Sequence, residues 1–234
     1  MDTESSRKRI LDRMRHALAA HPPQGQGSAA IPDRGGRVSV DGIFAPIEDS
    51  LARFRAECEA NHTQLHLVTA ESEADCLRKL LRSEQIELES RAGSEKSRVF
   101  VEPIFVQDAP ELRRLIEAAP MPVRWSSDGP PAGTDLAGIT LAEALVARTG
   151  SVLISSLNGG RAASVLPPLH IVYAPISQLV KELVEAIERV QASGRVRDVS
   201  MLSLIAGPSR TSDIEKMLVL GAHGPRRLAI LLRL

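Results

Sequence analysis

Short apolar runs alternate with amphipathic stretches along most of this chain. We expect strands at 63–68, 99–106, 123–126, 136–140, 151–155, 170–174, 199–206 and 228–234. We expect helices at 46–60, 71–82, 109–118, 141–148 and 176–191, where apolar side chains recur every three or four residues. This alternation is typical of βαβ units and predicts an α/β fold with an open, mostly parallel sheet and flanking helices. The run 199–206 is apolar almost throughout, which favours a central strand.

The N-terminal region has a different character. Residues 5–20 predict an amphipathic helix, and residues 21–37 are rich in Pro, Gly and Gln, as expected of a linker. We therefore expect an N-terminal helical extension with its linker at 1–37 and one α/β domain at 38–234. Two alternatives stay open for the apolar stripe of the first helix: it folds back on its own domain, or it docks on a partner subunit.

Composition excludes several classes of protein. The chain has 29 basic and 29 acidic residues and only 3% aromatic residues, which argues against nucleic-acid binding. No apolar run is long enough to span a membrane, and the charged N-terminus lacks the apolar core of a signal peptide. We therefore expect a cytoplasmic protein.

Redox cofactors are not expected in this chain. Cys58 and Cys76 stand alone, so thiolates cannot build an iron–sulfur or zinc site. His62 and His66 are four residues apart, but no third ligand lies near them in the sequence. The chain also lacks a GxGxxG dinucleotide motif, a P-loop and a GxSxG nucleophile elbow. The sequence predicts no metal site and no cofactor.

The first candidate binding loop is 155–164, SSLNGGRAAS, which follows an expected strand. Gly159 and Gly160 would let backbone amides approach a ligand, and a helix starting after them would favour an anion. Arg161 would add a bidentate partner for phosphate or carboxylate. The alternative is a tight turn with a solvated arginine.

The second candidate loop is 207–215, GPSRTSDIE. Ser212 and Glu215 match a capping box, which predicts a short helix and a structural role for both residues. Ser209, Arg210 and Thr211 would then face the cleft.

The third candidate loop is 221–225, GAHGP. His223 stands between two glycines and is the best candidate proton carrier, with Gly224 beside it in the binding loop. The alternative is a hydrogen-bonded structural histidine. We assign no nucleophile, because Glu143 is expected on a helix surface and Glu215 in a cap.

The stretches 149–175 and 206–225 resemble the LUD-domain family, in particular the small C-type proteins of lactate utilisation. Arg161, Pro167, Pro168 and His170 match positions that look characteristic of this family. The resemblance implies a fold of the NagB/RpiA/CoA-transferase type. It also implies a component of an L-lactate oxidation system that works with two iron–sulfur partner proteins.

Three functional hypotheses follow from these observations. The chain is a non-redox subunit that binds a small carboxylate or phosphate, or bridges its iron–sulfur partners. Alternatively, it is an enzyme acting on a phosphorylated or CoA-linked carboxylate, or a regulator that senses a carboxylate. The residues alone leave open whether this chain catalyses any reaction by itself.

Overall fold

The computed structural model describes residues 12–13, 16, 44–92, 98–101, 116–117, 121–125, 135–156, 161–194, 199–213, 217–220 and 224–234. The chain divides into two units, 1–46 and 47–234, and each is treated by itself. In the first unit, Asp12, Arg13 and His16 are helical, within the predicted helix 5–20. The linker 21–37 lies outside the described residues, so the predicted domain boundary stays a prediction.

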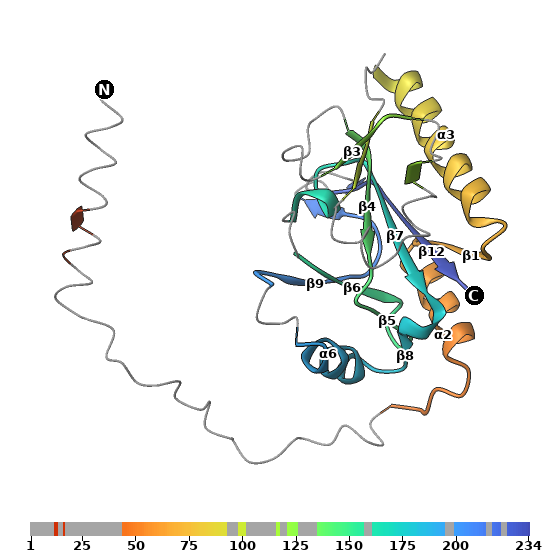
Figure 1. Cartoon of the computed structure of the whole chain (residues 1–234), viewed down its shortest axis with the longest axis vertical. Coiled ribbons are helices and arrows are strands. Elements are labelled where there is room, and N and C mark those ends of the chain that lie inside the picture. The colour runs from red at the N-terminus through yellow and green to blue at the C-terminus, as the bar shows by residue number, and fades with distance from the viewer. Residues whose placement is uncertain are drawn as a thin grey trace. The chain divides into compact units, whose positions relative to one another are not determined.

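A parallel sheet of six strands forms the centre of the second unit, and we call it the large sheet (Figure 1). Its spatial order is β1 (Gln64–Val68), β12 (Arg227–Arg233), β7 (Leu169–Pro175), β4 (Asp135–Leu141), β2 (Arg98–Val101) and β3 (Val123–Trp125). Every neighbouring pair runs parallel. This architecture confirms the predicted α/β fold. Within the large sheet, β4, β7 and β12 are buried over most of their length, as expected where both faces of a parallel sheet are covered.

One face of the large sheet is covered by α3 (Glu73–Ala92). Leu77, Leu80 and Leu81 of α3 are buried against this face, which we call the α3 face. The helix continues ten residues beyond the predicted end at 82, through the polar stretch 83–92. The charged residues of that stretch are good helix formers, so its polarity is compatible with a helix.

The opposite face of the large sheet packs against α2 (Ser50–Ala60) and a second, smaller sheet. Asp49 caps α2, since its carboxylate accepts hydrogen bonds from the backbone amides of Leu51 and Ala52, both at 2.9 Å. Phe54 and Cys58 of α2 are buried in the core on this side. Burial raises the pKa of the Cys58 thiol to about 12, as expected of an inert core cysteine.

The small sheet has the order β8 (Leu179–Val180), β5 (Ala144–Val146), β6 (Ser151–Ser155) and β9 (Leu202–Ile205). Its outer face is covered by α6 (Leu183–Ala192), through Ala186 and Val190. The run 199–206 therefore supplies an edge strand, β9, and the prediction of a central strand is wrong. Leu204 of β9 is 44% exposed, so the apolar run 199–206 is not buried on both faces of its sheet.

Two predicted helices are replaced partly or wholly by strands of the small sheet. The stretch 141–148 forms β5 and a turn, and 176–191 forms the 3-10 turn η3 (Ile176–Gln178), β8 and the shorter α6. Gly150 adopts a left-handed conformation, φ 61°, but in the turn between β5 and β6 rather than after a helix. A Cβ at Gly150 would lie 2.7 Å from the Cβ of Glu57 in α2, so this turn needs glycine on two grounds.

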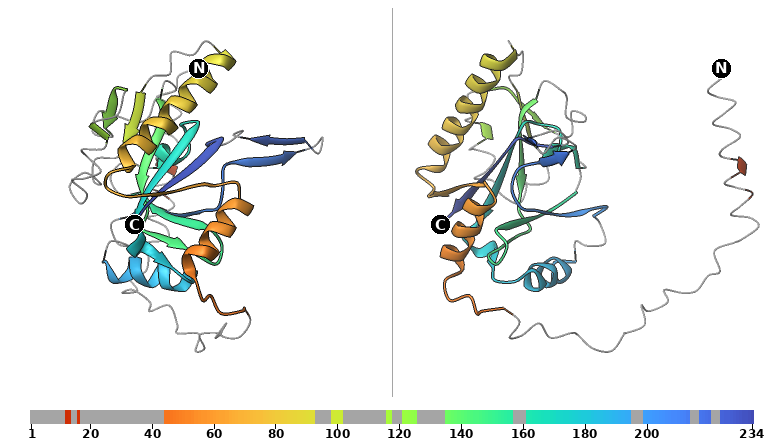
Figure 2. Two further views of the ribbon diagram at one scale, coloured as in Figure 1. Left: turned by 90° about the vertical axis from the view of Figure 1, so that its right-hand side faces the viewer. Right: turned by 180° about the vertical axis from the view of Figure 1, so that it is seen from behind.

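The predicted short helix after Gly207 is also wrong. Strands β10 (Arg210–Asp213) and β11 (Met217–Leu220) form an antiparallel hairpin, which extends away from the rest of the unit (Figure 2). Ser212 pairs with Leu218 in this hairpin and is no helix cap, while Glu215 lies outside the described residues. No helix in the described part of the chain is long and apolar enough to cross a membrane.

Candidate functional site

A pocket of about 260 Å³ lies between the large sheet and the inner face of the small sheet. It is lined by Ser164, Val165, His170, Met201, Ser203, Ile205, Gly207, Pro208, Ser209, Gly224, Pro225 and Leu228. His170 and Leu228 are direct neighbours near the starts of β7 and β12. Ligand sites of open α/β sheets usually lie at the carboxyl ends of the strands, so this pocket uses the opposite end.

His170 is the buried polar group of the pocket. Its side chain is 1% exposed, and its Nε2 lies 2.8 Å from Oγ1 of Thr140 on the neighbouring strand β4. Burial lowers the pKa of His170 from 6.5 to about 4, so the imidazole is neutral at physiological pH. A neutral imidazole held by one nitrogen can offer its other nitrogen as a hydrogen-bond partner.

The backbone of the 3-10 turn η2 (Arg161–Ser164) lies very close to β4, which brings the residues around Ser164 beside His170. This turn packs on β4 at Gly138, where a Cβ would lie 2.0 Å from the carbonyl oxygen of Ala163. Only glycine fits at this position, because the obstacle is backbone and cannot rotate away. Gly138 therefore lets Ser164 and Val165 reach the pocket beside His170.

The opposite wall is formed by two loops joined by a backbone hydrogen bond. The amide of Ser209 donates to the carbonyl oxygen of Pro225 at 2.9 Å. Gly207 has a φ of 83°, and a Cβ there would lie 2.3 Å from the carbonyl oxygen of Asn61. A Cβ on Gly224 would come within 3.0 Å of the Cβ of Ser209. Gly224 thus allows the 207–209 and 224–225 loops to approach each other, and Gly207 allows the first loop to pass close to Asn61 at the end of α2.

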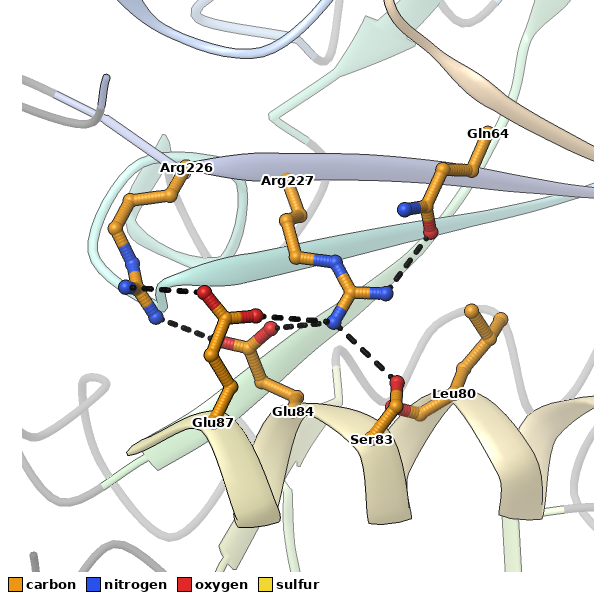
Figure 3. A network of polar contacts seen from close by, with 7 residues as sticks. All are labelled: Gln64, Leu80, Ser83, Glu84, Glu87, Arg226 and Arg227. Carbon is orange, nitrogen blue, oxygen red and sulfur yellow. Dashed lines mark hydrogen bonds and ion pairs between the residues drawn. The ribbon is translucent and has the colours of Figure 1, made fainter. Parts of the chain in front are cut away.

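The second of these loops is anchored from the α3 face of the large sheet (Figure 3). Arg226 and Arg227, which follow Pro225, both donate to the carboxylate of Glu84, at 2.8 and 2.9 Å. The side chain of Glu84 is fully buried, and Glu87 lies 3.7–3.8 Å from the same two guanidinium groups. The backbone amides of both arginines also donate to the carbonyl oxygen of Pro168. These contacts fix the start of β12 and so the pocket wall beside it.

The structure brings some of the predicted site residues together. Ser209 and Gly224 line the pocket, and Arg161 begins the turn whose last residue, Ser164, also lines it. Gly159, Gly160 and His223 lie outside the described residues, and Thr211 lies in β10. The η2 turn is only four residues long, so it does not supply the helix N-terminus expected after the glycines.

Arg210 is not among the residues that line the pocket. Its guanidinium donates to the carbonyl oxygen of Asn61 at 3.0 Å, which ties the start of the hairpin to the end of α2. The prediction that Glu143 lies on a helix surface is wrong. Glu143 sits between β4 and β5 and accepts a hydrogen bond from the Ser155 hydroxyl at 2.6 Å.

Sequence reasoning missed Thr140 and Ser203 and noted His170 only through the family resemblance. The available signal was a polar residue inside a strand that is otherwise apolar, as His170 is in β7 and Thr140 in β4. Such residues are buried only when a partner satisfies them, which here is each other. Within the described residues, no group of three His, Cys, Asp or Glu side chains is placed to hold a metal ion.

A family model described as the LUD domain matches residues 130–232. Residues 130–232 of the chain are a LUD domain. All twelve residues that line the pocket fall inside the matched region, and so does Thr140.

Several relatives of this LUD-domain protein are named lactate utilization protein C. The chain is 41% identical to the one from Shouchella clausii, over 38% of this chain and 39% of that protein. It is 37% identical to the one from Deinococcus radiodurans, over 51% of this chain and 62% of the relative. The chain thus spans between about two fifths and three fifths of the length of these relatives.

A solved structure shares the fold. The crystal structure of a duf162 family protein from Deinococcus radiodurans superposes with a TM-score of 0.52 and 22% identity, covering 80% of this chain and 99% of that one. At this identity, the likeness supports the α/β fold of the chain and not a shared activity.

Proposed function

We propose that the chain is a non-redox subunit of an L-lactate utilisation system and that it binds a small carboxylate in the pocket. The observation that carries this proposal is that the pocket and the match to the LUD domain fall in the same part of the chain. The names of the relatives then suggest lactate as the starting compound of the pathway.

The groups around the pocket suit a hydroxy acid. Ser164, His170 and Ser209 offer hydroxyl and imidazole groups to a carboxylate or an alcohol. Arg161, three residues before Ser164, is proposed to supply the positive charge that a bound carboxylate needs. Oxidation of lactate removes two electrons, and we propose that two iron–sulfur partner proteins accept them.

Growth and reconstitution test the proposed system. Loss of the gene should impair growth on L-lactate in a strain with no other lactate dehydrogenase. In vitro, the iron–sulfur partners with this chain should reduce a dye with L-lactate, and the chain alone should not. Normal growth of the deletion strain would refute the proposal. Turnover of a phosphorylated or CoA-linked carboxylate by the chain alone would favour the enzyme alternative instead.

A matched pair of arginine variants tests the binding site. Arg161→Ala should weaken carboxylate binding by about 1.5–3 kcal/mol, the range for a hydrogen bond to a charged group. Arg210→Ala is the control, because its guanidinium contacts the Asn61 carbonyl and not the pocket. Equal affinities of the Arg161→Ala variant and the unchanged protein, measured by titration calorimetry, would contradict the role of Arg161.

A further inference from the structure

The walls of the pocket are mainly aliphatic, beyond what a carboxylate and a hydroxyl require. Val165 from the η2 loop and Leu228 from β12 form two sides. Ile205 of β9 and Met201, which directly precedes β9, form the third. Ser203 shares the inner face of β9 with Ile205, because residues two apart along a strand point the same way.

The described part of the pocket lining is uncharged. Among the described residues that line the pocket, none carries a formal charge at neutral pH, since His170 is held neutral by burial. The ionic pairs of the region lie on the α3 face instead, around Glu84. A carbon chain is therefore the part of a ligand that fits against these walls.

The size of the pocket leads to the same conclusion. Its volume of about 260 Å³ approaches the lower end of small-molecule sites, roughly 300–1,000 Å³. The methyl group of lactate would cover only part of the surface offered by Val165, Met201, Ile205 and Leu228. Apolar surface that stays uncovered contributes nothing to affinity, whereas each methylene that covers it does.

We infer that the pocket takes 2-hydroxy or 2-oxo carboxylates with aliphatic side chains longer than the methyl group of lactate, and binds them more tightly than lactate. This inference rests on the proposed carboxylate site and adds the chemical class of its ligands. The carboxylate end lies toward Ser164 and the η2 turn, and the aliphatic end lies against β9. Met201, Ser203 and Ile205 are then the residues that determine specificity.

The test is a homologous series measured on the full chain. L-Lactate, L-2-hydroxybutanoate and L-2-hydroxypentanoate are titrated by calorimetry under one set of conditions. Each methylene buried against the wall should tighten binding about fourfold, so the longest acid should bind roughly fifteenfold more tightly than lactate.

Two variants of neighbouring residues on β9 locate the effect. Ser203→Leu fills the aliphatic end of the pocket and should abolish the gain in affinity with chain length. Leu204→Ala is the matched control, because Leu204 is 44% exposed and does not line the pocket. It should keep the full chain-length dependence. Thermal unfolding of both variants verifies that they are folded, and Ser203→Val, which adds less volume, replaces Ser203→Leu if that variant unfolds.

The outcomes separate the two proposals. Lactate binding with no gain for the longer acids overturns this inference and leaves the carboxylate site standing. A gain that persists in Ser203→Leu also overturns it, because the aliphatic chain must then bind elsewhere. Absence of binding by every acid overturns the carboxylate site itself, and this inference with it.

Discussion

The starts of β7 and β12 present two different environments on the two faces of the large sheet. On the α3 face, Arg227 reaches Glu84, and Arg226 joins it there (Figure 3). On the opposite face, at the adjacent positions of the same strands, His170 and Leu228 border an open pocket. Alternation along a strand thus separates a cluster of charges from a neutral cavity by a single residue.

The difference shows which polar groups serve the fold and which are available to a ligand. On the α3 face the charges satisfy each other, since Glu84 is fully buried and receives a hydrogen bond from each arginine. On the pocket face the polar groups are uncharged and border empty volume. In this region, the highest charge density therefore marks structure, and the few neutral polar residues mark the candidate site.

A second polar cluster holds the start of α3. The Tyr173 hydroxyl donates to Glu73 at 3.0 Å, and Arg233 donates to the same hydroxyl at 3.3 Å. Burial raises the pKa of Tyr173 to about 12, and the nearby Glu73 carboxylate adds to the effect of burial. Glu73 begins α3 and Glu84 lies three turns later, so polar contacts at both strand ends fix the position of the helix on the sheet.

Among the substitutions that test this comparison, removal of the Glu84 carboxylate should have the largest effect on the free energy of unfolding. Glu84→Gln keeps the shape of the side chain but leaves Arg226 and Arg227 without their buried carboxylate. Breaking a buried pair by removing one partner typically costs about 3–5 kcal/mol. We expect a fall of that size in the free energy of unfolding, measured by urea denaturation.

The replacement of all three residues provides the control for this prediction. A variant with Glu84→Leu, Arg226→Met and Arg227→Met should recover much of the lost stability, because no unpaired charge is left buried. A loss below about 1 kcal/mol in Glu84→Gln would mean that the cluster is solvated in solution, and the contrast between the two faces would not hold.

The neutral side of the comparison predicts a dependence of stability on pH. The pKa of His170 is about 4 in the folded chain, below its ordinary value of 6.5, because of burial. Between these values the unfolded chain binds the proton and the folded chain does not, so stability falls as the pH is lowered from 6.5 toward 4. The shift corresponds to about 3 kcal/mol.

The measurement compares urea unfolding at pH 7 and pH 4.5 for the unchanged chain and for His170→Gln. The variant should lose less stability over this interval, by up to about 3 kcal/mol. His66→Gln is measured alongside, because burial and the nearby Arg227 also lower the pKa of His66. Identical pH profiles for His170→Gln and the unchanged chain would show that His170 is already solvated in the pocket.

The sequence predicted the α/β class because the strands of the large sheet are short apolar runs, such as 228–234. It did not predict the small sheet, because its strands β5 and β8 are only two or three residues long. Their apolar spacing also fits a helix, and only the pairing of β5 with β6 and of β8 with β5 decides between helix and strand. The apolar run at β9 was placed in the wrong sheet for a similar reason, since the sequence does not show which strand it pairs with.

The sequence predicted the loops of the candidate site but not the strand residues that the pocket also needs. Gly207, Ser209 and Gly224 stand out in a sequence, because glycine and serine clusters mark turns. The pocket also needs His170 from one strand and Gly138 from another, more than thirty residues apart. The close approach at Gly138 is a property of the packed fold, and no local pattern in the sequence reports it.

The smallest expected effect on stability concerns Glu87, which can be compared with Glu84 within the same charged cluster. Glu87 lies one turn after Glu84 on α3 and faces the same two guanidinium groups. Its side chain is 36% exposed, however, and its nearest contacts with them are 3.7–3.8 Å, beyond hydrogen-bond distance. Pairs of this kind contribute about 0–1 kcal/mol, because water screens them and ordering long side chains costs entropy.

Glu87→Gln should therefore lower the free energy of unfolding by less than about 1 kcal/mol, and added salt should reduce the difference further. Glu84→Gln, with the same chemical change one turn earlier, should keep most of its larger effect in salt because the side chain of Glu84 is fully buried. Urea denaturation of both variants at low and high ionic strength measures this contrast. Equal losses for the two variants would show that net charge, and not burial, determines how the cluster stabilises the start of β12.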